Sequence, residues 1–228
     1  MFVRRGLRTM ENLTIAIDGP AGSGKSTISK KIASKLNIIY IDTGAMYRAL
    51  TLKIVRNNTN LDNKIELNRI LQNTSIDFRN NHIFLDDEVV DEEIRNNKIS
   101  TIVSDVAKIK EVREKLVEIQ RNIAKNKSVI MDGRDIGSYV LPDANYKFYI
   151  TASIEERGSR RYNELAEKGY NTSLDVIINE IRERDRIDST RKFAPLVKCN
   201  DAIEIDTTDK AINEVVSEIL DIVTRGEK

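Results

Sequence analysis

The stretch GPAGSGKST, which runs from Gly19 to Thr27, constrains the fold more than any other part of the sequence. It fits the pattern G-x-x-x-x-G-K-[ST], in which glycines let a loop turn its backbone N–H groups toward a phosphate. Lys25 would add a point charge beside the β- and γ-phosphates, and Ser26 a hydroxyl ligand for Mg²⁺. The residues that we expect to bind a nucleoside triphosphate are Gly19, Pro20, Ala21, Gly22, Ser23, Gly24, Lys25, Ser26 and Thr27.

The segments on either side of this loop support the prediction. LTIAID (Leu13–Asp18) is a β-branched apolar run typical of a buried strand. After the loop, Ile28, Ile32 and Leu36 recur every four residues, which predicts an amphipathic helix. The positive N-terminal end of that helix would face the phosphate. The alternative is a flexible glycine turn in front of a helix, which the preceding strand disfavours.

The rest of the chain alternates between short apolar runs and helical patterns. This alternation predicts a P-loop NTPase-type three-layer α/β/α fold, in which helices cover both faces of a five-stranded, mainly parallel sheet. One helix is expected to begin with Thr43 as its cap, and one long helix is expected over residues 99–123. The further strands are expected at residues 38–42, 128–132, 146–150 and 202–206, and the further helices at residues 153–168, 173–191 and 210–223.

One stretch interrupts this alternation. Residues 57–97 are rich in Asn and Asp, and within them SIDF and HIFLDDEVV flank RNN, which predicts a small hairpin. We interpret residues 57–97 as an insertion on a kinase-like core that spans residues 11–228. The first ten residues are expected to be an N-terminal extension, with Met10 as a second candidate start of translation.

Composition excludes several classes of protein. The net charge is +1, so the chain has no overall attraction to nucleic acid or to an anionic membrane. No apolar run approaches the roughly 20 residues that a membrane-spanning helix needs. The one cysteine, Cys199, cannot form an internal disulfide, which fits the reducing cytosol and a packing role. We therefore expect a soluble cytoplasmic protein without a nucleic-acid or membrane partner.

Charged side chains follow the second and third expected strands. Arg48 lies in DTGAMYR, and MDGRDIG contains Asp132, Arg134 and Asp135. Because the carboxyl ends of parallel strands form the ligand-binding edge of an open sheet, Arg48 is a candidate to clamp a second phosphate. Asp132 occupies a position suited to orienting Mg²⁺ through water. The alternative for Arg134 and Asp135 is a simple salt bridge within their loop.

Two further clusters lie on the charged helices. Arg184, Asp188 and Arg191 share one helical face, as a solvated row of surface salt bridges also would. In EERGSRR, the arginines at 157, 160 and 161 also share a face. Like charges at this spacing repel one another unless an anion lies opposite, and a transferring phosphate would be such an anion.

Together these motifs resemble the bacterial cytidylate kinase family. IDGPAGSGKST, DTGAMYR, DGRDIG, EERGSRR and IRERDRIDSTR with APL just after it occur in the family's order, from about Leu13 to the C-terminus. Adenylate and guanylate kinases share the loop but not the DGRD and RDxxD elements in this arrangement. The resemblance makes residues 57–97 the enlarged nucleoside-monophosphate-binding insertion that is typical of the bacterial enzymes.

The resemblance implies transfer of the γ-phosphate of ATP to CMP or dCMP by a monomer, with Mg²⁺, in pyrimidine nucleotide metabolism. Lys25 and Arg134 would act in the transfer, together with Arg157, Arg160 and Arg161 on a mobile lid at residues 153–191. The residues that it assigns to the acceptor are Arg48, Arg134 and Arg191 for the phosphate, Ser104, Arg113 and Asp135 for the cytosine edge, and Arg184 and Asp188 for the sugar hydroxyls.

Two other functions stay open at this point. A different small-molecule kinase would use the same loop with an acceptor other than CMP. A nucleotide-dependent switch would also use this loop, but the N-K-x-D element of switch GTPases is missing from the sequence, and the arginine clusters would then lack a purpose. His82, the one histidine, is expected to be solvated beside the hairpin turn and to take no part in catalysis.

Overall fold

The computed structural model describes residues 12–79 and 82–226, so the expected N-terminal extension lies outside the described residues. The chain forms two compact units. The first unit comprises the chain up to Tyr40 and from Asn126 onward, and the second unit comprises Ile41–Lys125. The candidate phosphate-binding loop therefore belongs to the first unit, and Arg48 belongs to the second.

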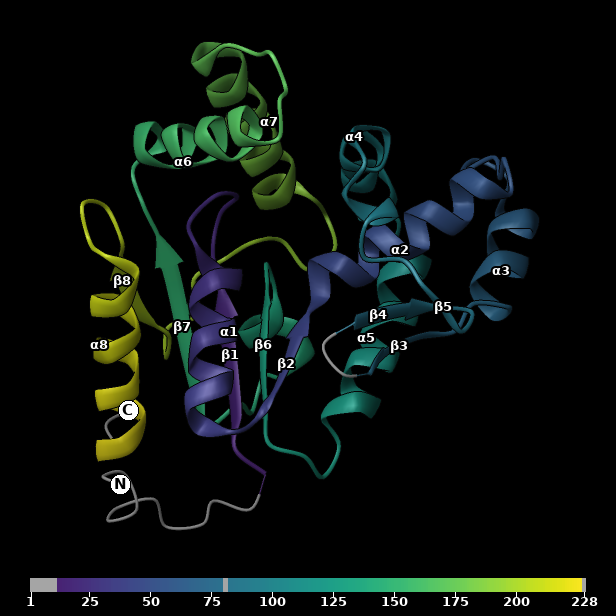
Figure 1. Ribbon diagram of the computed structural model, residues 1–228. Helices are drawn as coiled ribbons and strands as arrows, with labels where there is room; N and C mark the ends of the chain where they lie inside the picture. Colours follow the sequence, from purple (N-terminus) through teal and green to yellow (C-terminus); the bar gives the residue numbers. More distant parts are fainter. Residues whose placement is uncertain (1–11, 80–81, 227–228) are drawn as a thin grey trace. The chain divides into compact units, whose positions relative to one another are not determined.

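A five-stranded sheet with the order β2-β6-β1-β7-β8 organises the first unit (Figure 1). β1 runs parallel to β6 and β7, and β7 runs parallel to β8. The register places Ile17 opposite Asp132, so the ends of β1 and β6 are level with each other. The predicted five-stranded, mainly parallel sheet is thus confirmed. The strands are β1 (Thr14–Asp18), β2 (Ile39–Asp42), β6 (Val129–Gly133), β7 (Tyr146–Thr151) and β8 (Ile203–Asp206).

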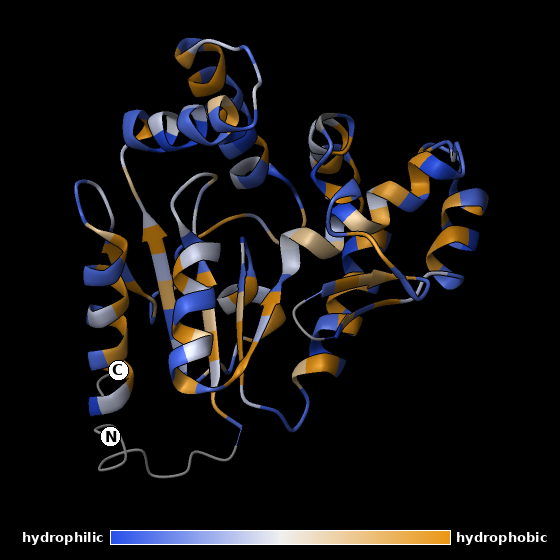
Figure 2. Cartoon of the chain, viewed as in Figure 1, coloured by the Kyte–Doolittle hydropathy of each residue, from blue (hydrophilic) through white to orange (hydrophobic). Residues whose placement is uncertain are grey.

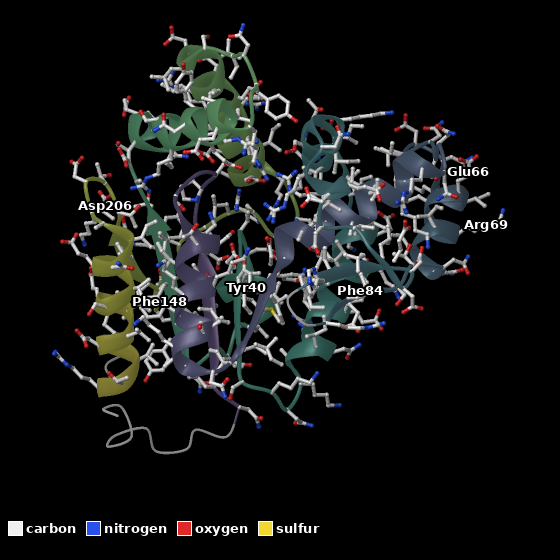
Figure 3. The ribbon with its side chains drawn as sticks, viewed as in Figure 1. Tyr40, Glu66, Arg69, Phe84, Phe148 and Asp206 are labelled. Atoms are coloured by element: carbon white, nitrogen blue, oxygen red, sulfur yellow. The ribbon has the colours of Figure 1, made fainter. Side chains whose placement is uncertain are left out.

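Two helices of the first unit, α1 (Lys25–Leu36) and α8 (Ile212–Arg225), pack on this sheet. Ile32 of α1 and Ile219 of α8 are fully buried in one core with Phe148 of β7, which Figure 3 labels. Figure 2 shows the matching hydrophobic colour on the strands and on the helix faces. Burial of each such side chain contributes about 1.5–3 kcal/mol, which explains why these apolar runs form the strands and the helix faces.

Serine is the N-cap residue of two more helices, α6 (Ile154–Glu167) and α7 (Leu174–Thr190). The Ser153 hydroxyl accepts a hydrogen bond from the Glu156 N–H at 3.2 Å, and Ser173 accepts one from the Val176 N–H at 3.4 Å. A smaller core joins Ile177 of α7 to Ala21 of the phosphate-binding loop. The helices therefore form close to their expected ranges, and α7 packs beside the loop. The first unit also contains the short π-helical turn η2 (Ile136–Val140).

The second unit combines helices with a small antiparallel sheet (Figure 1). In that sheet β3 pairs with β4, which carries the Phe84 labelled in Figure 3, and β4 pairs with β5. The hairpin expected from SIDF and HIFLDDEVV is confirmed. The elements are α2 (Thr43–Arg56), α3 (Lys64–Gln72), β3 (Ile76–Arg79), β4 (His82–Leu85), β5 (Glu88–Val89), the 3-10 turn η1 (Glu93–Arg95), α4 (Asn97–Val106) and α5 (Lys110–Ala124).

Two local predictions in this unit are wrong. The cap of α2 is Asp42, whose carboxylate accepts a hydrogen bond from the Ala45 N–H at 2.9 Å, and not Thr43. The long helix expected over residues 99–123 is two helices, α4 and α5, because Ile109 takes an extended conformation between them. The guanidinium of Arg113 donates to the carbonyl oxygen of Ala107 at 3.1 Å, which satisfies a carbonyl at the end of α4.

Candidate active site

The loop between β1 and α1 is held closely against the first unit's sheet. A Cβ on Gly19, whose φ is 148°, would collide with the backbone carbonyl oxygen of Ile150 on β7. Gly22 has a φ of 76°, and a Cβ there would lie 3.2 Å from the Cβ of Arg157. Close packing and left-handed backbone therefore require glycine at both positions. The helix α1 begins at Lys25, directly after the loop, as expected for a phosphate site.

Lys25 lies inside this loop. Its Nζ donates to the carbonyl oxygen of Pro20 at 2.6 Å and to the Ser23 hydroxyl at 3.2 Å. Burial lowers the pKa of Lys25 well below its usual value; nearby Arg134 lowers it further, while Asp132 acts in the opposite direction. A buried cation in these surroundings would be stabilised by the arrival of an anion such as a phosphate group.

Ser26 and Asp132 lie together beside the loop. The Ser26 hydroxyl donates to one carboxylate oxygen of Asp132 at 2.8 Å, and the hydroxyl of Tyr40, labelled in Figure 3, donates to the other at 2.8 Å. Across the described ranges, no cluster of three or more His, Cys, Asp or Glu is placed to hold a metal. One hydroxyl and one carboxylate fit Mg²⁺, which usually keeps waters and takes phosphate oxygens as its remaining ligands.

The loop after β6 pairs with α7. Arg134 Nε donates to Asp188 Oδ2 at 2.8 Å, and Arg191 contacts Asp188 at 3.5 Å and Asp135 at 3.4 Å. Burial raises the pKa of Asp188, but Arg134, Arg184 and Arg191 outweigh it and hold the pKa below its usual value. The alternative of a solvated surface row of Arg184, Asp188 and Arg191 is wrong, since Asp188 is 6% exposed. Ion pairs join Arg134 and Asp135 to α7 and its C-terminal end, so the loop is more than a local salt bridge.

Asp18, at the end of β1, holds the same loop from its other side. Its two carboxylate oxygens accept hydrogen bonds from the N–H groups of Ile136 and Gly137 at 2.8 and 2.7 Å. Burial raises the pKa of Asp18 to about 6, although those two N–H groups favour the ionised form. The end of β1 thus fixes the turn that immediately follows Arg134 and Asp135.

The arginines of α6 do not share one anion in this structure. Arg157 is buried and donates to Asp185 at 2.5 Å. Arg160 donates to Glu156 at 2.8 Å and to the backbone and hydroxyl of Thr207, and Arg161 pairs with Glu164 at 2.7 Å. Anions do lie opposite these arginines, as their spacing requires, but they are the protein's own carboxylates, Glu156, Glu164 and Asp185.

In the second unit, Arg48 lies on α2 and Arg113 lies on α5. Arg48 Nη1 donates to the Ser100 hydroxyl of α4 at 2.8 Å. Arg113, 1% exposed, has its guanidinium carbon 5.2 Å from the centre of the Tyr47 ring. Ser104 is half-buried one turn after Ser100, so the two hydroxyls share a face of α4. The structure therefore positions each predicted acceptor residue of this unit within well-packed helices.

Several residues of this site were not predicted from the sequence. Asp18, Tyr40 and Ser100 each hold a predicted residue or loop. Asp18 lies in IDGPAGSGKST, but that motif assigns it no role, and Tyr40 and Ser100 lie in none of the motifs. Asp185 was visible inside IRERDRIDSTR, and only the packing of α7 on the loop reveals its contacts. His82 is mostly exposed, with Nδ1 2.6 Å from Asp91, in agreement with a solvated position.

This arrangement can bind two anionic groups. The first unit offers a glycine-bounded loop with a buried lysine, and a separate set of arginines ordered by carboxylates. Among the residues placed by the structure, there is no helix with the length and apolar character that crossing a bilayer demands. These features suit a kinase that moves a phosphoryl group between small molecules.

Comparison with known proteins identifies the family. The family model described as cytidylate kinase matches residues 15–225. A cytidylate kinase of Clostridioides difficile (strain 630) is 61% identical over 211 residues, which is 92% of this chain and 98% of that protein. A cytidylate kinase of Alkaliphilus oremlandii (strain OhILAs) is 55% identical over 214 residues, 94% of this chain and 99% of that protein.

Solved structures agree on the fold. An uncharacterized protein from Eubacterium ventriosum aligns with a TM-score of 0.51 at 15% identity, covering 93% of this chain and 98% of that one. A shikimate kinase from Bacteroides thetaiotaomicron aligns with a TM-score of 0.50 at 12% identity, covering 92% and 98%. At such identities the likeness shows the fold alone. The match of the family model from β1 to the end of α8, with the resemblance of the motifs, shows that the chain belongs to the cytidylate kinase family.

Proposed function

We propose that this protein transfers the γ-phosphate of ATP to CMP or dCMP, giving CDP or dCDP and ADP. The observation that carries the proposal is the family match over residues 15–225, with relatives named cytidylate kinase at 61% and 55% identity. The phosphate loop and the arginine–carboxylate cluster of the first unit supply groups of the kind that such a transfer needs.

The donor would lie in the loop from Gly19 to Thr27. Lys25 would leave Pro20 and Ser23 to contact the β- and γ-phosphates, exchanging neutral oxygens for charged ones. Ser26 and Asp132 would hold Mg²⁺, directly and through water. When bound, Mg²⁺ would offset charge on the phosphate oxygens of the donor.

The acceptor would be bound by arginines and by polar side chains. Arg134 and Arg191 would contact its phosphate, and their present pairing with Asp188 keeps both guanidinium groups ordered before binding. The remaining proposed contacts are Arg48 for the phosphate, Ser104, Arg113 and Asp135 for the cytosine, and Arg184 and Asp188 for the sugar.

The proposed chemistry needs no protein nucleophile. An oxygen of the acceptor phosphate attacks the γ-phosphorus, the bond to the β-phosphate oxygen breaks, and ADP leaves. The chain's part is to hold the two nucleotides in line and to neutralise developing charge with Lys25 and with Arg160 and Arg161 of α6. Closure of α6 and α7 as a lid would exclude water, the competing acceptor.

The setting of the reaction also forms part of the proposal. We infer a monomeric cytoplasmic enzyme of pyrimidine nucleotide metabolism, whose partners are small nucleotides and neither nucleic acid nor membranes. The near-neutral charge balance and the one cysteine support this setting.

A coupled assay of ADP release tests the proposed function. ATP would be supplied with CMP, dCMP, UMP or AMP in parallel, and we expect CMP and dCMP to give the highest kcat/KM. The variant Arg134→Ala should lose both CMP affinity and turnover, because the acceptor phosphate loses an ordered guanidinium. A higher kcat/KM with AMP or UMP would assign the chain to another acceptor, and ATP hydrolysis that ignores CMP would favour a switch.

A further inference from the structure

Arg157 is placed unlike an arginine that waits for substrate. It is 8% exposed, and its guanidinium already has three acceptors. Nε donates to the carbonyl oxygen of Ala152 at 3.0 Å, and Nη1 donates to that of Ala21 at 2.9 Å and to the Asp185 carboxylate at 2.5 Å. A buried guanidinium with these partners would have to give up good hydrogen bonds before it could contact a phosphate.

Asp185 completes a clamp on the phosphate-binding loop. Its other carboxylate oxygen accepts a hydrogen bond from the N–H of Ala21 at 3.0 Å. The backbone of Ala21 is therefore held at both polar ends, at its N–H by Asp185 and at its carbonyl by Arg157. A Cβ built on Gly22, the next residue, would lie 3.2 Å from the backbone oxygen of Arg157. The loop therefore passes close to α6 at Gly22 as well.

We propose that Arg157 and Asp185 form a positioning pair that fixes the donor loop against α6 and α7, and that Arg157 does not itself contact the transferring phosphate. This inference rests on the proposed function, because it takes the loop to be the ATP site. Asp185 lies between Arg184 and Asp188 on α7, so the helix that holds the loop also carries two proposed acceptor residues.

The charges of the pair lead to an unusual expectation. With Arg157 removed, the Asp185 carboxylate stays beside the loop without its cation, and it repels donor phosphates and misplaces Ala21. An asparagine at 185 keeps an oxygen that can accept from the Ala21 N–H but carries no charge. Loss of the carboxylate charge should therefore repair part of the damage caused by loss of the arginine.

The test is a cycle of three variants: Arg157→Met, Asp185→Asn and the double variant. Arg157→Met should lower kcat about 100-fold, as expected when a misplaced loop no longer holds its substrate in line. Asp185→Asn should lower it about tenfold, and the double variant should return to roughly the level of Asp185→Asn, because the two residues act as a unit. Arg186→Gln is the matched control, since Arg186 forms an exposed pair with Glu183 on the same helix and should leave kcat unchanged.

Binding of a fluorescent ADP analogue without acceptor gives a second readout. Arg157→Met should weaken this binding about tenfold, and Asp185→Asn in the same chain should restore most of it, as neutralising an unpaired charge would. A folded double variant that turns over no faster than Arg157→Met, or one that binds no better, would overturn the pair and assign Arg157 to the phosphate.

Failure of Arg157→Met to fold and failure of the proposed function can both be told apart from failure of the pair. If Arg157→Met does not fold, the double variant decides: turnover near that of Asp185→Asn supports the pair, and near-complete loss overturns it. If the unsubstituted protein binds the ADP analogue but transfers nothing to CMP, the proposed function fails, while the binding cycle still tests the pair by itself.

Discussion

Arg134 and Arg157 of the first unit and Arg48 of the second unit are held by different contacts. In the first unit, Arg134 and Arg157 lie against the carboxylates of Asp188 and Asp185, at 2.8 and 2.5 Å. In the second unit, Arg48 donates to the hydroxyl of Ser100 at 2.8 Å, and Arg113 to a backbone carbonyl oxygen at 3.1 Å. Carboxylates order a guanidinium and offset its charge, whereas a hydroxyl or a carbonyl orders it without offsetting that charge.

This difference suggests a division of roles. An arginine that is already paired with a carboxylate attracts an anion less strongly, but its guanidinium is already oriented. It therefore contributes to phosphate binding mainly through its fixed geometry. A hydroxyl such as that of Ser100 orders an arginine without adding a charge of its own. For the proposed acceptor phosphate, we expect the order of Arg134 and the charge of Arg48 to be the larger contributions.

Lys25 breaks the pattern inside the first unit, because its Nζ donates to the neutral oxygens of Pro20 and Ser23. We expect Lys25→Met to lower kcat about 1000-fold, since removal of one preorganised donor from a reacting centre typically costs 100- to 1000-fold. ADP release at saturating CMP measures the effect. Lys35→Met, in the exposed last turn of the same helix, is the control and should keep full turnover. A Lys25→Met enzyme with more than a tenth of normal turnover would remove the lysine from the transfer.

Arg48→Met is expected to have the next largest effect. A lost charge-assisted contact with a phosphate should lower kcat/KM for CMP about 100-fold, equivalent to about 2.7 kcal/mol. The KM for ATP at saturating CMP should stay unchanged. Arg56→Met is a matched control on the same helix, because Arg56 pairs with exposed Glu88 and Glu93. An unchanged kcat/KM in Arg48→Met would contradict the role given to its charge.

The same contrast explains what could be predicted from the sequence. The phosphate loop and the strand before it were predicted because their signals are local: glycines, a lysine and an apolar run at fixed spacing. The break between α4 and α5 was missed because no Gly or Pro marks Ala107–Ile109. The chain bends there without a breaker residue, and Arg113 accommodates the bend from the next helix.

The partners of the arginines were the least predictable part of the site. Residues three or four apart on one helix can be read from the sequence, and Arg161 with Glu164 is such a pair. The pair of Arg157 and Asp185 joins two helices, and Arg134 reaches Asp188 from a loop. Many carboxylates were available to each arginine, and only tertiary packing selects among them. For that reason the positions of the arginines could be predicted from the sequence, but their carboxylate partners could not.

Asp18 is a buried carboxylate of the first unit that is held by two backbone N–H groups instead of by a cation. Its pKa shows whether those hydrogen bonds offset the cost of burying its charge. Its pKa is raised by burial from 3.8 to about 6, so the folded protein binds a proton more tightly than the unfolded chain. Stability from this group is therefore present at low pH and falls as the pH rises from about 4 to 6. Relative to Asp18→Asn, the free energy of unfolding should fall by about 2 kcal/mol between pH 4.5 and 7.

Urea unfolding of both proteins at the two pH values checks this expectation. The difference between the proteins isolates Asp18, because other titrating groups contribute equally to both. A difference that stays constant with pH, or that changes in the opposite direction, would mean that the two N–H groups compensate the ionised carboxylate fully.

Ser100→Ala gives the smallest expected effect and the finest test of the comparison between the units. It removes the hydroxyl that orders Arg48 but leaves the charge of Arg48 in place. The KM for CMP should rise about tenfold, near the roughly 1.5 kcal/mol of a hydrogen bond to a charged group, with kcat unchanged. Thr101→Val, on the exposed neighbour in α4, removes a hydroxyl that donates to the carbonyl oxygen of Lys98 and should leave the KM unchanged. If Ser100→Ala were as damaging as Arg48→Met, order rather than charge would be the contribution of Arg48, and Arg48 and Arg134 would act in the same way.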